Sequence, residues 1–281
     1  MKLSKKVLAA FSVAAALAMA VSFVSCANEE ADDEEGAISG SNNNYTLVYD
    51  NTTGTDNYRC YKPTKNNHRG ALCQITLKKE GTSFPGAAMG YIWDLYSTDA
   101  SASAEEVARS VSSKPRNFCI VGFNYSNTSS GKVAYYVSRY TNVYDIQAKN
   151  FGEDGVEVNG KTEKAVETPY LDLNTTNTFT PTPDADGNII VTVNVYEETS
   201  GTETTGGYVV DIYDGAVTKD TLSAATKKAT TTIPADALGY DTAKKATQRQ
   251  GAVYANVYKG YKASGAWKYN YTYSADEVVE E

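Results

Sequence analysis

Acidic side chains near the start of the chain are the first residues whose spacing suggests chemistry. Glu30, Asp32 and Glu34 alternate along the sequence, and alternate residues of a β-strand point to one face of a sheet. Two carboxylates held on one face could act as the acid and the nucleophile of glycoside hydrolysis. These three, however, lie in a run of acids without apolar alternation, and such runs stay hydrated. We therefore interpret them as part of a solvated segment.

The rest of the chain offers no comparable catalytic arrangement. Four acids fall in expected strands, and no two of them stand two residues apart in one strand: Asp94, Asp145, Glu197 and Asp211. The single histidine, His68, lies in the polar stretch KNNHRG, and no nucleophile-elbow motif accompanies it, although a Ser-His-Asp or Cys-His mechanism would require it. The sequence therefore predicts no catalytic residue, but carboxylates from different strands could still meet.

Metal and cofactor sites also have little support. Asp184, Asp186 and Asn188 bring three oxygen-bearing side chains together, and calcium prefers oxygen ligands. Gly187 is misplaced for an EF-hand loop, and Asp-Gly ahead of a strand is an ordinary turn signal. Zinc is disfavoured by the single histidine and the absence of a CxxC pair. We predict no metal and no cofactor, with weak calcium binding at most.

The cysteines leave one question open. Cys60 and Cys73 lie in neighbouring expected strands, joined by a loop with Pro63 and Gly70. A Cys60–Cys73 disulfide is one interpretation for an exported protein. The other is that no bridge forms, because the odd number of cysteines remaining in the body favours neither case. Cys119 is expected to be a small buried apolar residue.

Aromatic and charged residues of two expected strands form a candidate ligand platform. Tyr136 and Tyr140 share one face of KVAYYVSRYTNV, whereas Arg139 lies on the other face, and Trp93 and Asp94 belong to AAMGYIWDLYS. The rings could line a cleft in which Asp94 and Arg139 orient a ligand. Alternatively, the two charged residues form surface pairs or loop caps. If a ligand site exists, these five residues are our prediction for it.

A second aromatic pattern is interpreted as packing. Trp267, Tyr269, Tyr271 and Tyr273 alternate with polar residues, which places the four rings on one face of a strand. Such a stripe could stack on sugar rings. Strand aromatics more often pack a core, and we favour that interpretation here.

The amino-terminal segment predicts the cellular location of the protein. Three lysines within the first six residues precede the apolar, alanine-rich stretch Val7 to Val24, which is the pattern of a secretion signal. Phe23-Val24-Ser25-Cys26 resembles the lipobox of bacterial lipoproteins, with Phe23 in place of the usual leucine. The resemblance implies that residues 1–25 are removed as a signal peptide and that Cys26 carries acyl chains such as palmitate. The alternative is an ordinary signal peptide with an incidental cysteine.

Residues 26–43 are expected to be an acidic, flexible tether between the lipid and the body. Their acids repel one another, and the Gly, Ser and Asn residues that follow add flexibility. We therefore expect a protein anchored by lipid in the bacterial cell envelope, at the outer membrane or cell surface rather than at the inner membrane. The formal net charge of −8 disfavours nucleic acid as a partner.

Residues 44–281 are predicted to be a single β-sandwich domain. The chain has 22 tyrosines against 7 phenylalanines and 2 tryptophans, and tyrosine suits half-buried pleated surfaces. Short apolar segments separated by turn signals predict an all-β, two-sheet antiparallel sandwich. Ala104 to Ser110 is the one helix-like turn.

The order of these segments carries a family resemblance. GYIWDLY, FCIVGFNY, YYVSRYTNV, VTVNVYEE, YVVDIYDG and GAVYANVYKG…GAWKYNYTY together resemble the concanavalin A-like lectin/glucanase (laminin G-like) sandwiches. The resemblance implies a curved jelly roll whose relatives bind or cleave glycans. No catalytic motif of that family falls on an expected strand, and a shared fold does not establish a shared function.

Three hypotheses follow for the body. The first is an extracytoplasmic protein that binds a glycan or a surface protein without catalysis. The second is a glycan hydrolase on the same fold, which needs two carboxylates in a cleft. The third is a structural surface protein without a small ligand.

Overall fold

The computed structural model describes residues 37–64, 70–80, 86–125, 131–173, 176–200, 203–235 and 249–273. Strands dominate this part of the chain, and short helical turns join some of them. The elements are β1 (Ile38–Ser41), β2 (Asn44–Asp50), β3 (Tyr58–Thr64), β4 (Ala71–Leu77), β5 (Ala87–Ser97), α2 (Ala104–Ala108), β6 (Val111–Asn124), β7 (Val133–Asp145), η3 (Lys149–Gly152), β8 (Val156–Val158), β9 (Lys161–Glu163), β10 (Val166–Leu171), β11 (Thr178–Phe179), β12 (Ile189–Ser200), β13 (Glu203–Asp214), η4 (Lys219–Ala224), β14 (Lys227–Ile233), β15 (Gln250–Val257) and β16 (Lys262–Thr272).

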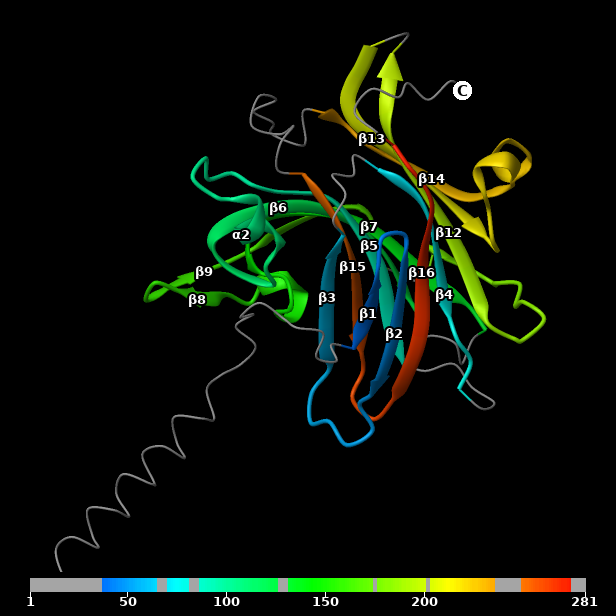
Figure 1. The fold of residues 1–281 in the computed structure, drawn as a ribbon, viewed down its shortest axis with the longest axis horizontal. Coiled ribbons are helices and arrows are strands. Elements are labelled where there is room, and N and C mark those ends of the chain that lie inside the picture. The colour runs from blue at the N-terminus through cyan, green and yellow to red at the C-terminus, as the bar shows by residue number, and fades with distance from the viewer. Residues whose placement is uncertain are drawn as a thin grey trace, which may run out of the picture. The chain divides into compact units, whose positions relative to one another are not determined.

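Two large antiparallel sheets contain most of these strands (Figure 1). The first sheet has the order β1-β2-β16-β4-β12-β13-β14. The second has the order β10-β7-β6-β5-β15-β3, with β11 pairing with β7. The predicted all-β, two-sheet antiparallel sandwich is therefore confirmed.

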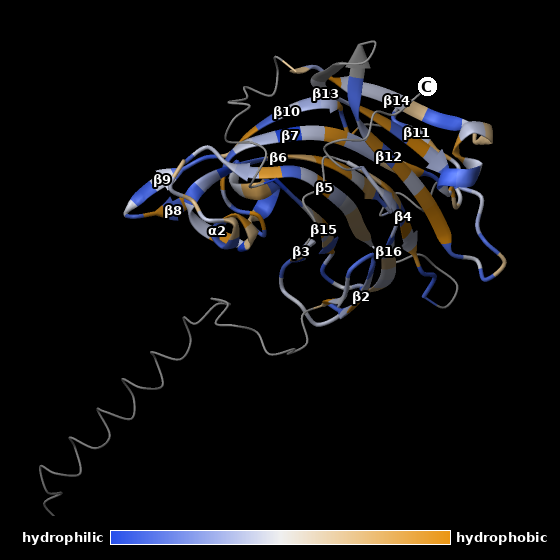
Figure 2. Ribbon diagram, turned by 45° about the horizontal axis from the view of Figure 1, so that its top comes forward, coloured by the Kyte–Doolittle hydropathy of each residue, from blue (hydrophilic) through white to orange (hydrophobic). Residues whose placement is uncertain are grey.

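The main apolar core lies between the two sheets. It combines residues from the first sheet, such as Ile75 and Val193, with residues from the second, such as Tyr91 and Val121. Figure 2 shows apolar residues along the central strands and polar residues around β8 and β9. Trp267 of β16 crosses this core, where its indole Nε1 donates to the carbonyl oxygen of Gly90 in β5 at 3.0 Å. Burial of this apolar surface is the main stabilising contribution.

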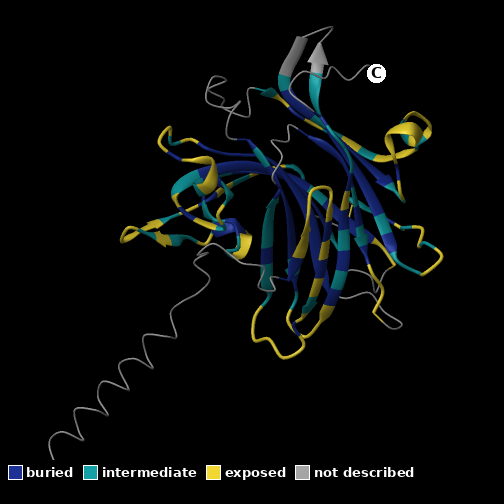
Figure 3. Cartoon of the chain, in the orientation of Figure 1, coloured by how far each residue is buried: buried dark blue, intermediate teal, exposed yellow. Residues whose placement is uncertain are grey.

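The second sheet is also covered on part of its outer face, the face turned away from the first sheet. Burial in β2 alternates along much of the strand, as expected where one face meets solvent, whereas β5 is buried at every position (Figure 3). A second apolar cluster explains the difference, since it packs Ile92, Phe118 and Ile120 against Val107 of α2 and Phe151 of η3. The segments around α2 and η3 therefore cover part of the outer face of the second sheet, and we call these two segments the roof.

A buried arginine holds this roof in place. The guanidinium of Arg116 on β6 is fully buried and donates to the carbonyl oxygens of Ser110 at 3.0 Å, Tyr144 at 2.6 Å and Val143 at 3.3 Å. Burial lowers the pKa of Arg116 to about 10, so the group stays charged at neutral pH. These bonds tie the connection after α2 to the end of β7.

The start of the sandwich differs from the expected boundary. Residues 38–41 were predicted to lie in the tether, but they form β1 and pair with β2. Ile38 is buried against the core, and Asn42 with φ 57° allows the tight turn into β2. The polar stretch from 152 to 183 likewise holds four short strands, β8 to β11. The signal segment, Cys26, the acid run and His68 lie outside the described residues.

The predicted helix-like turn is present as α2. Ser103 caps it, accepting from the backbone amide of Glu106 while the Glu106 side chain accepts from the Ser103 amide. No helix in the described ranges has both the length and the apolar character needed to cross a membrane.

Candidate binding site

A row of residues across the outer face of the second sheet contains two glycines between two tyrosines. The register pairs Tyr254 of β15 with Gly90 of β5, Gly90 with Gly122 of β6, and Gly122 with Tyr136 of β7. A Cβ atom on Gly122 would overlap the phenol ring of Tyr136. The Tyr136 ring therefore occupies the space over Gly122 that a side chain would otherwise fill.

The neighbouring row adds polar groups to the same face. Arg59 of β3 pairs with Asn256 of β15, Asn256 with Ala88 of β5, and Ala88 with Asn124 of β6. Because residues two apart in a strand share a face, this polar row lies beside the tyrosine–glycine row. Arg59 and the two asparagine amides supply hydrogen-bond donors and acceptors next to the rings.

Together the two rows and the roof enclose a cavity of about 260 Å³. Its walls are aromatic, amide and charged side chains from both rows and from the segment around η3 and β10. The lining residues are Arg59, Ala88, Asn124, Tyr136, Tyr140, Asn150, Phe151, Glu153, Glu167, Leu173, Tyr254, Asn256 and Tyr258. A cavity with apolar walls and a few convergent polar groups is the usual form of a small-ligand site.

Phe151 forms one wall in an unusual backbone conformation. Its φ is 54° and that of Asn150 is 48°, a region that costs energy for a bulky residue. The Phe151 ring is held by three neighbours, with centroid distances of 4.6 Å to Tyr140, 5.0 Å to Tyr254 and 5.1 Å to Phe118. This packing offsets the strain and fixes the wall of the cavity.

Two carboxylates lie at one end of the cavity. Glu167 of β10 pairs in register with Tyr140 of β7, and it accepts a short hydrogen bond from the Ser138 hydroxyl. Partial burial, with smaller contributions from Glu167 and Asp154, raises the pKa of Glu153 above its ordinary value. Burial and the nearby Tyr136 and Glu167 raise the pKa of Tyr140, so its phenol stays protonated and can donate to Glu167.

Neither carboxylate is neutralised by a side chain of the described chain. Glu153 and Glu167 form no ion pair with lysine or arginine among the described residues. The nearest lysine pairing in this segment is Lys149 with Asp154, at 3.0 Å on the surface.

The opposite end carries the guanidinium of Arg59. The nearby Tyr254 is buried, and this burial raises the pKa of its phenol well above the ordinary value, although Arg59 opposes the shift. Asn256, which pairs with Arg59, has a buried Oδ1 without a hydrogen-bond partner in the described residues. Buried polar atoms are normally satisfied, so this acceptor marks the polar row as a place where a ligand group would be stabilised.

The structure separates the five platform residues predicted from the sequence. Tyr136 and Tyr140 line the cavity. Trp93 is fully buried in the core between the sheets, and Arg139, also buried, pairs in register with Cys119 next to it. Asp94 is buried too, on the same side as Trp93. The structure thus does not bring Trp93, Asp94 and Arg139 to the two tyrosines.

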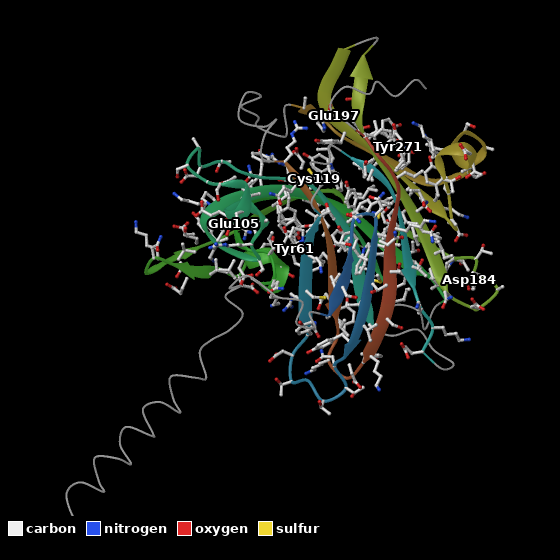
Figure 4. All side chains as sticks on the ribbon, in the orientation of Figure 1. Tyr61, Glu105, Cys119, Asp184, Glu197 and Tyr271 are labelled. Carbon is white, nitrogen blue, oxygen red and sulfur yellow. The ribbon has the colours of Figure 1, made fainter. Side chains whose placement is uncertain are left out.

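Asp94 belongs to a buried polar network that joins the sheets. Its Oδ1 lies 3.0 Å from Nε of Arg249 and accepts from the Tyr208 hydroxyl at 3.1 Å. Nη1 of Arg249 donates to Glu197 Oε1 at 2.9 Å and to the Tyr208 oxygen at 3.1 Å. Asp94 lies in β5 of the second sheet, and Arg249 directly precedes β15 of the same sheet. Glu197, labelled in Figure 4, and Tyr208 come from the first sheet. Asp94 has φ 54° at a bulge of β5, and this conformation turns its carboxylate toward Arg249.

The remaining sequence candidates have structural roles in the described chain. Cys60, Cys73 and Cys119 are free, buried thiols, with Cys60 in the second sheet and Cys73 in the first. Asp184 accepts from the amides of Asp186 and Asn188, as in a turn. No group of three or more metal-ligating His, Cys, Asp or Glu side chains occurs among the described residues.

The aromatic stripe near the end of the chain packs as the core interpretation expects. Trp267 and Tyr269 lie in the core between the sheets, and Tyr273 is buried with its hydroxyl donating to Asn194 at 2.7 Å. A bulge between Tyr269 and Tyr271 breaks the alternation. The ammonium of Lys219 lies over the Tyr271 ring, 3.6 Å from the ring centroid.

The sequence analysis missed the cavity residues outside β7. Tyr254 and Asn256 alternate in AVYAN, and that spacing is a signal which could have found them. Glu153 and Glu167 lie in the polar stretch from 152 to 183, where no apolar alternation marks a strand. Arg59 has no distinguishing local pattern.

No family model matches the chain, and no curated protein matches it. Among solved structures, the chain is similar to a legume lectin-like domain from Entamoeba histolytica, with 11% identity over 85% of this chain and 86% of that one and a TM-score of 0.36. It is also similar to the lectin UEA-II complexed with galactose, with 12% identity over 83% and 86% of the two chains and a TM-score of 0.23. The assignment to the two-sheet β-sandwich class rests on the strand order and core described above.

Proposed function

We propose that this chain is a carbohydrate-binding protein whose ligand occupies the cavity on the outer face of the second sheet. The observation that carries the proposal is the cavity itself, in which the rings of Tyr136, Tyr140 and Tyr254 lie beside polar side chains. Sugar rings present apolar faces that stack on aromatic side chains, and hydroxyl groups that need hydrogen-bond partners. Arg59, Asn124 and Asn256 supply such partners beside the rings.

A binding role suits the composition of the cavity. Its tyrosines offer large contact areas with few rotatable bonds, so ordering them on binding costs little entropy. The strained Phe151 wall is already held by its neighbours, which favours a preformed site. A protein ligand is the competing possibility, and a cavity of about 260 Å³ accommodates a sugar unit better than an extended protein surface.

Glycoside hydrolysis is a second candidate, favoured by one observation. Glu153 and Glu167 reach the same cavity from different segments, which meets the requirement for two carboxylates that no single strand satisfied. Glu153 has the raised pKa that a general acid needs. The Glu167 carboxylate, however, already accepts a bond from Ser138, and we propose binding as the primary role.

Replacing Tyr254 with alanine is expected to abolish retention on glycan columns. The variant loses a cavity ring and its stacking energy of about 1–1.5 kcal/mol, which corresponds to about a fivefold to tenfold loss of affinity. The full chain, purified in mild detergent, would be passed over immobilised β-glucans, other cell-surface glycans and matrix proteins, with released sugar measured in parallel.

The matched control is Tyr271→Ala, which removes a tyrosine from β16 of the other sheet and should leave retention intact. Retention of wild type on proteins alone, or on nothing, would refute the carbohydrate proposal. Sugar release by wild type that disappears in Glu153→Gln would establish the hydrolase instead.

We further propose that the chain is anchored to a membrane of the bacterial envelope through acyl chains on Cys26. The support is the basic start, the apolar run and the lipobox-like residues before Cys26. Stable anchoring takes more than one acyl chain, and the acidic residues that follow would keep the sandwich away from the lipid surface.

The Cys26→Ala variant is expected to move from the detergent phase to the aqueous phase in a partitioning experiment, because no acyl chain can be attached. Wild-type protein from the same bacterial host should remain in the detergent phase, and Cys119→Ala serves as the cysteine control. A Cys26→Ala product that enters the detergent phase like wild type would contradict the proposal.

A further inference from the structure

We infer that the cavity prefers glycans with a free amino group, and that the sugar ammonium lies between Glu153 and Glu167 against the aromatic walls. This inference rests on the proposed carbohydrate-binding function and names the class of sugar. Its starting point is the charge of the cavity, where two carboxylates face one guanidinium.

The two carboxylates lack a cationic partner of their own. No lysine or arginine of the described chain forms an ion pair with Glu153 or Glu167. Like charges brought together in a partly desolvated site repel each other. A bound ammonium would relieve that repulsion and form charge-assisted hydrogen bonds with both groups.

Hydrogen bonds from neighbouring side chains hold the Glu167 carboxylate in one orientation, ready to accept a hydrogen bond from a ligand. Ser138 is buried and holds one carboxylate oxygen, Oε1, by its hydrogen bond, and the Tyr140 hydroxyl bonds to the same carboxylate. A carboxylate accepts up to about four hydrogen bonds, so Glu167 retains capacity for a ligand donor. Its orientation is set before the ligand arrives.

The aromatic walls strengthen the preference for a cation. Tyr136, Tyr140 and Phe151 line the same cavity as the acids, and the negative face of an aromatic ring attracts an ammonium. Acids and rings at one end thus both favour the same ligand group.

The position of Arg59 determines the orientation in which an amino sugar would bind. It lies on β3, whereas Glu167 lies on β10, and these strands are the two edges of the second sheet. An ammonium is repelled from the Arg59 end and attracted to the acidic end, while Arg59 and Asn256 can bond to hydroxyl oxygens and hydroxyl groups of the next sugar unit. The cavity therefore orients an amino sugar along the row.

The test compares two oligosaccharides of equal length that differ only in the amine. Glucosamine oligomers and N-acetylglucosamine oligomers would be titrated into the full chain in detergent, at a pH where the amine is protonated and the carboxylates are ionised. We expect the free amine to bind about tenfold more tightly at physiological salt. Glu153→Gln and Glu167→Gln should each reduce this preference about threefold to tenfold.

Glu105→Gln is the matched control, because Glu105 is an exposed acid on α2 that pairs only with Arg109 on its own helical turn. It should leave the preference unchanged, which separates the cavity from general attraction of cations by an acidic protein. Equal binding of both oligomers, or a preference unchanged by Glu153→Gln and Glu167→Gln, would overturn the inference and leave the carbohydrate proposal standing. Binding of no glycan at all would overturn both.

Discussion

Replacing Arg249 with methionine is expected to lower the free energy of unfolding by about 3–5 kcal/mol. Arg249 is 3% exposed and is the cation that bonds to both Asp94 and Glu197, which are 2% and 11% exposed. Without it, two carboxylates would remain close together in the interior with part of their hydrogen bonding lost. Breaking a buried ion network on one side costs far more than the network itself contributes, because the remaining charges stay desolvated.

Chemical denaturation of wild type and variants would measure this effect. Adding Asp94→Asn and Glu197→Gln to Arg249→Met should recover most of the lost stability, since the two side chains that lost this cation are then neutral. Asparagine also tolerates the positive φ of residue 94. The control Arg109→Met breaks an exposed pair of a single helical turn and should cost less than about 0.5 kcal/mol. An Arg249→Met variant within 1 kcal/mol of wild type would show that the network does not join the sheets energetically.

The second large effect is expected from a single methyl group. Gly122→Ala places a Cβ atom where the Tyr136 ring now lies, and overpacking of this kind costs about 1–3 kcal/mol. The Tyr136 ring, which lines the cavity, must also move, so the cavity changes shape and glycan retention should be lost. Both the free energy of unfolding and retention on glycan columns would be measured.

A double-mutant comparison distinguishes this clash from a general intolerance of Gly122. In a Tyr136→Ala background the obstructing ring is absent, so adding Gly122→Ala should cost little stability. The difference between the two backgrounds is the interaction energy of the pair. An equal cost in both backgrounds would mean that the backbone at residue 122, and not the ring, requires glycine.

Sequence reasoning found the sheets more readily than the site, and the reason is physical. Alternating apolar residues report burial on one face, so β2 and β7 were recognisable from their own sequence. A site, by contrast, depends on which strands become neighbours. Tyr136 and Tyr140 were found because they share a face of one strand, whereas Tyr254 joins them only through the order β7-β6-β5-β15.

Some residues suggest a ligand site in the sequence but lie in the interior of the structure, as Trp93, Asp94 and Arg139 do. An aromatic residue flanked by charge suggests a ligand platform, but the same residues also suit a polar network between sheets. The bulge at Asp94, with its positive φ, decides between the two by turning the carboxylate inward. No local pattern in GYIWDLY predicts that bulge, and the partner Arg249 is more than 150 residues away in sequence.

The three free cysteines have a consequence for how the protein can be handled. Burial raises the pKa of the Cys60 thiol to about 12 and raises that of Cys73 as well, so almost no reactive thiolate exists at neutral pH. Cys60, Cys73 and Cys119 are all free thiols in the described sandwich. A thiol reagent can reach these residues only when the sheets separate. The rate of cysteine labelling therefore measures how often the native state opens.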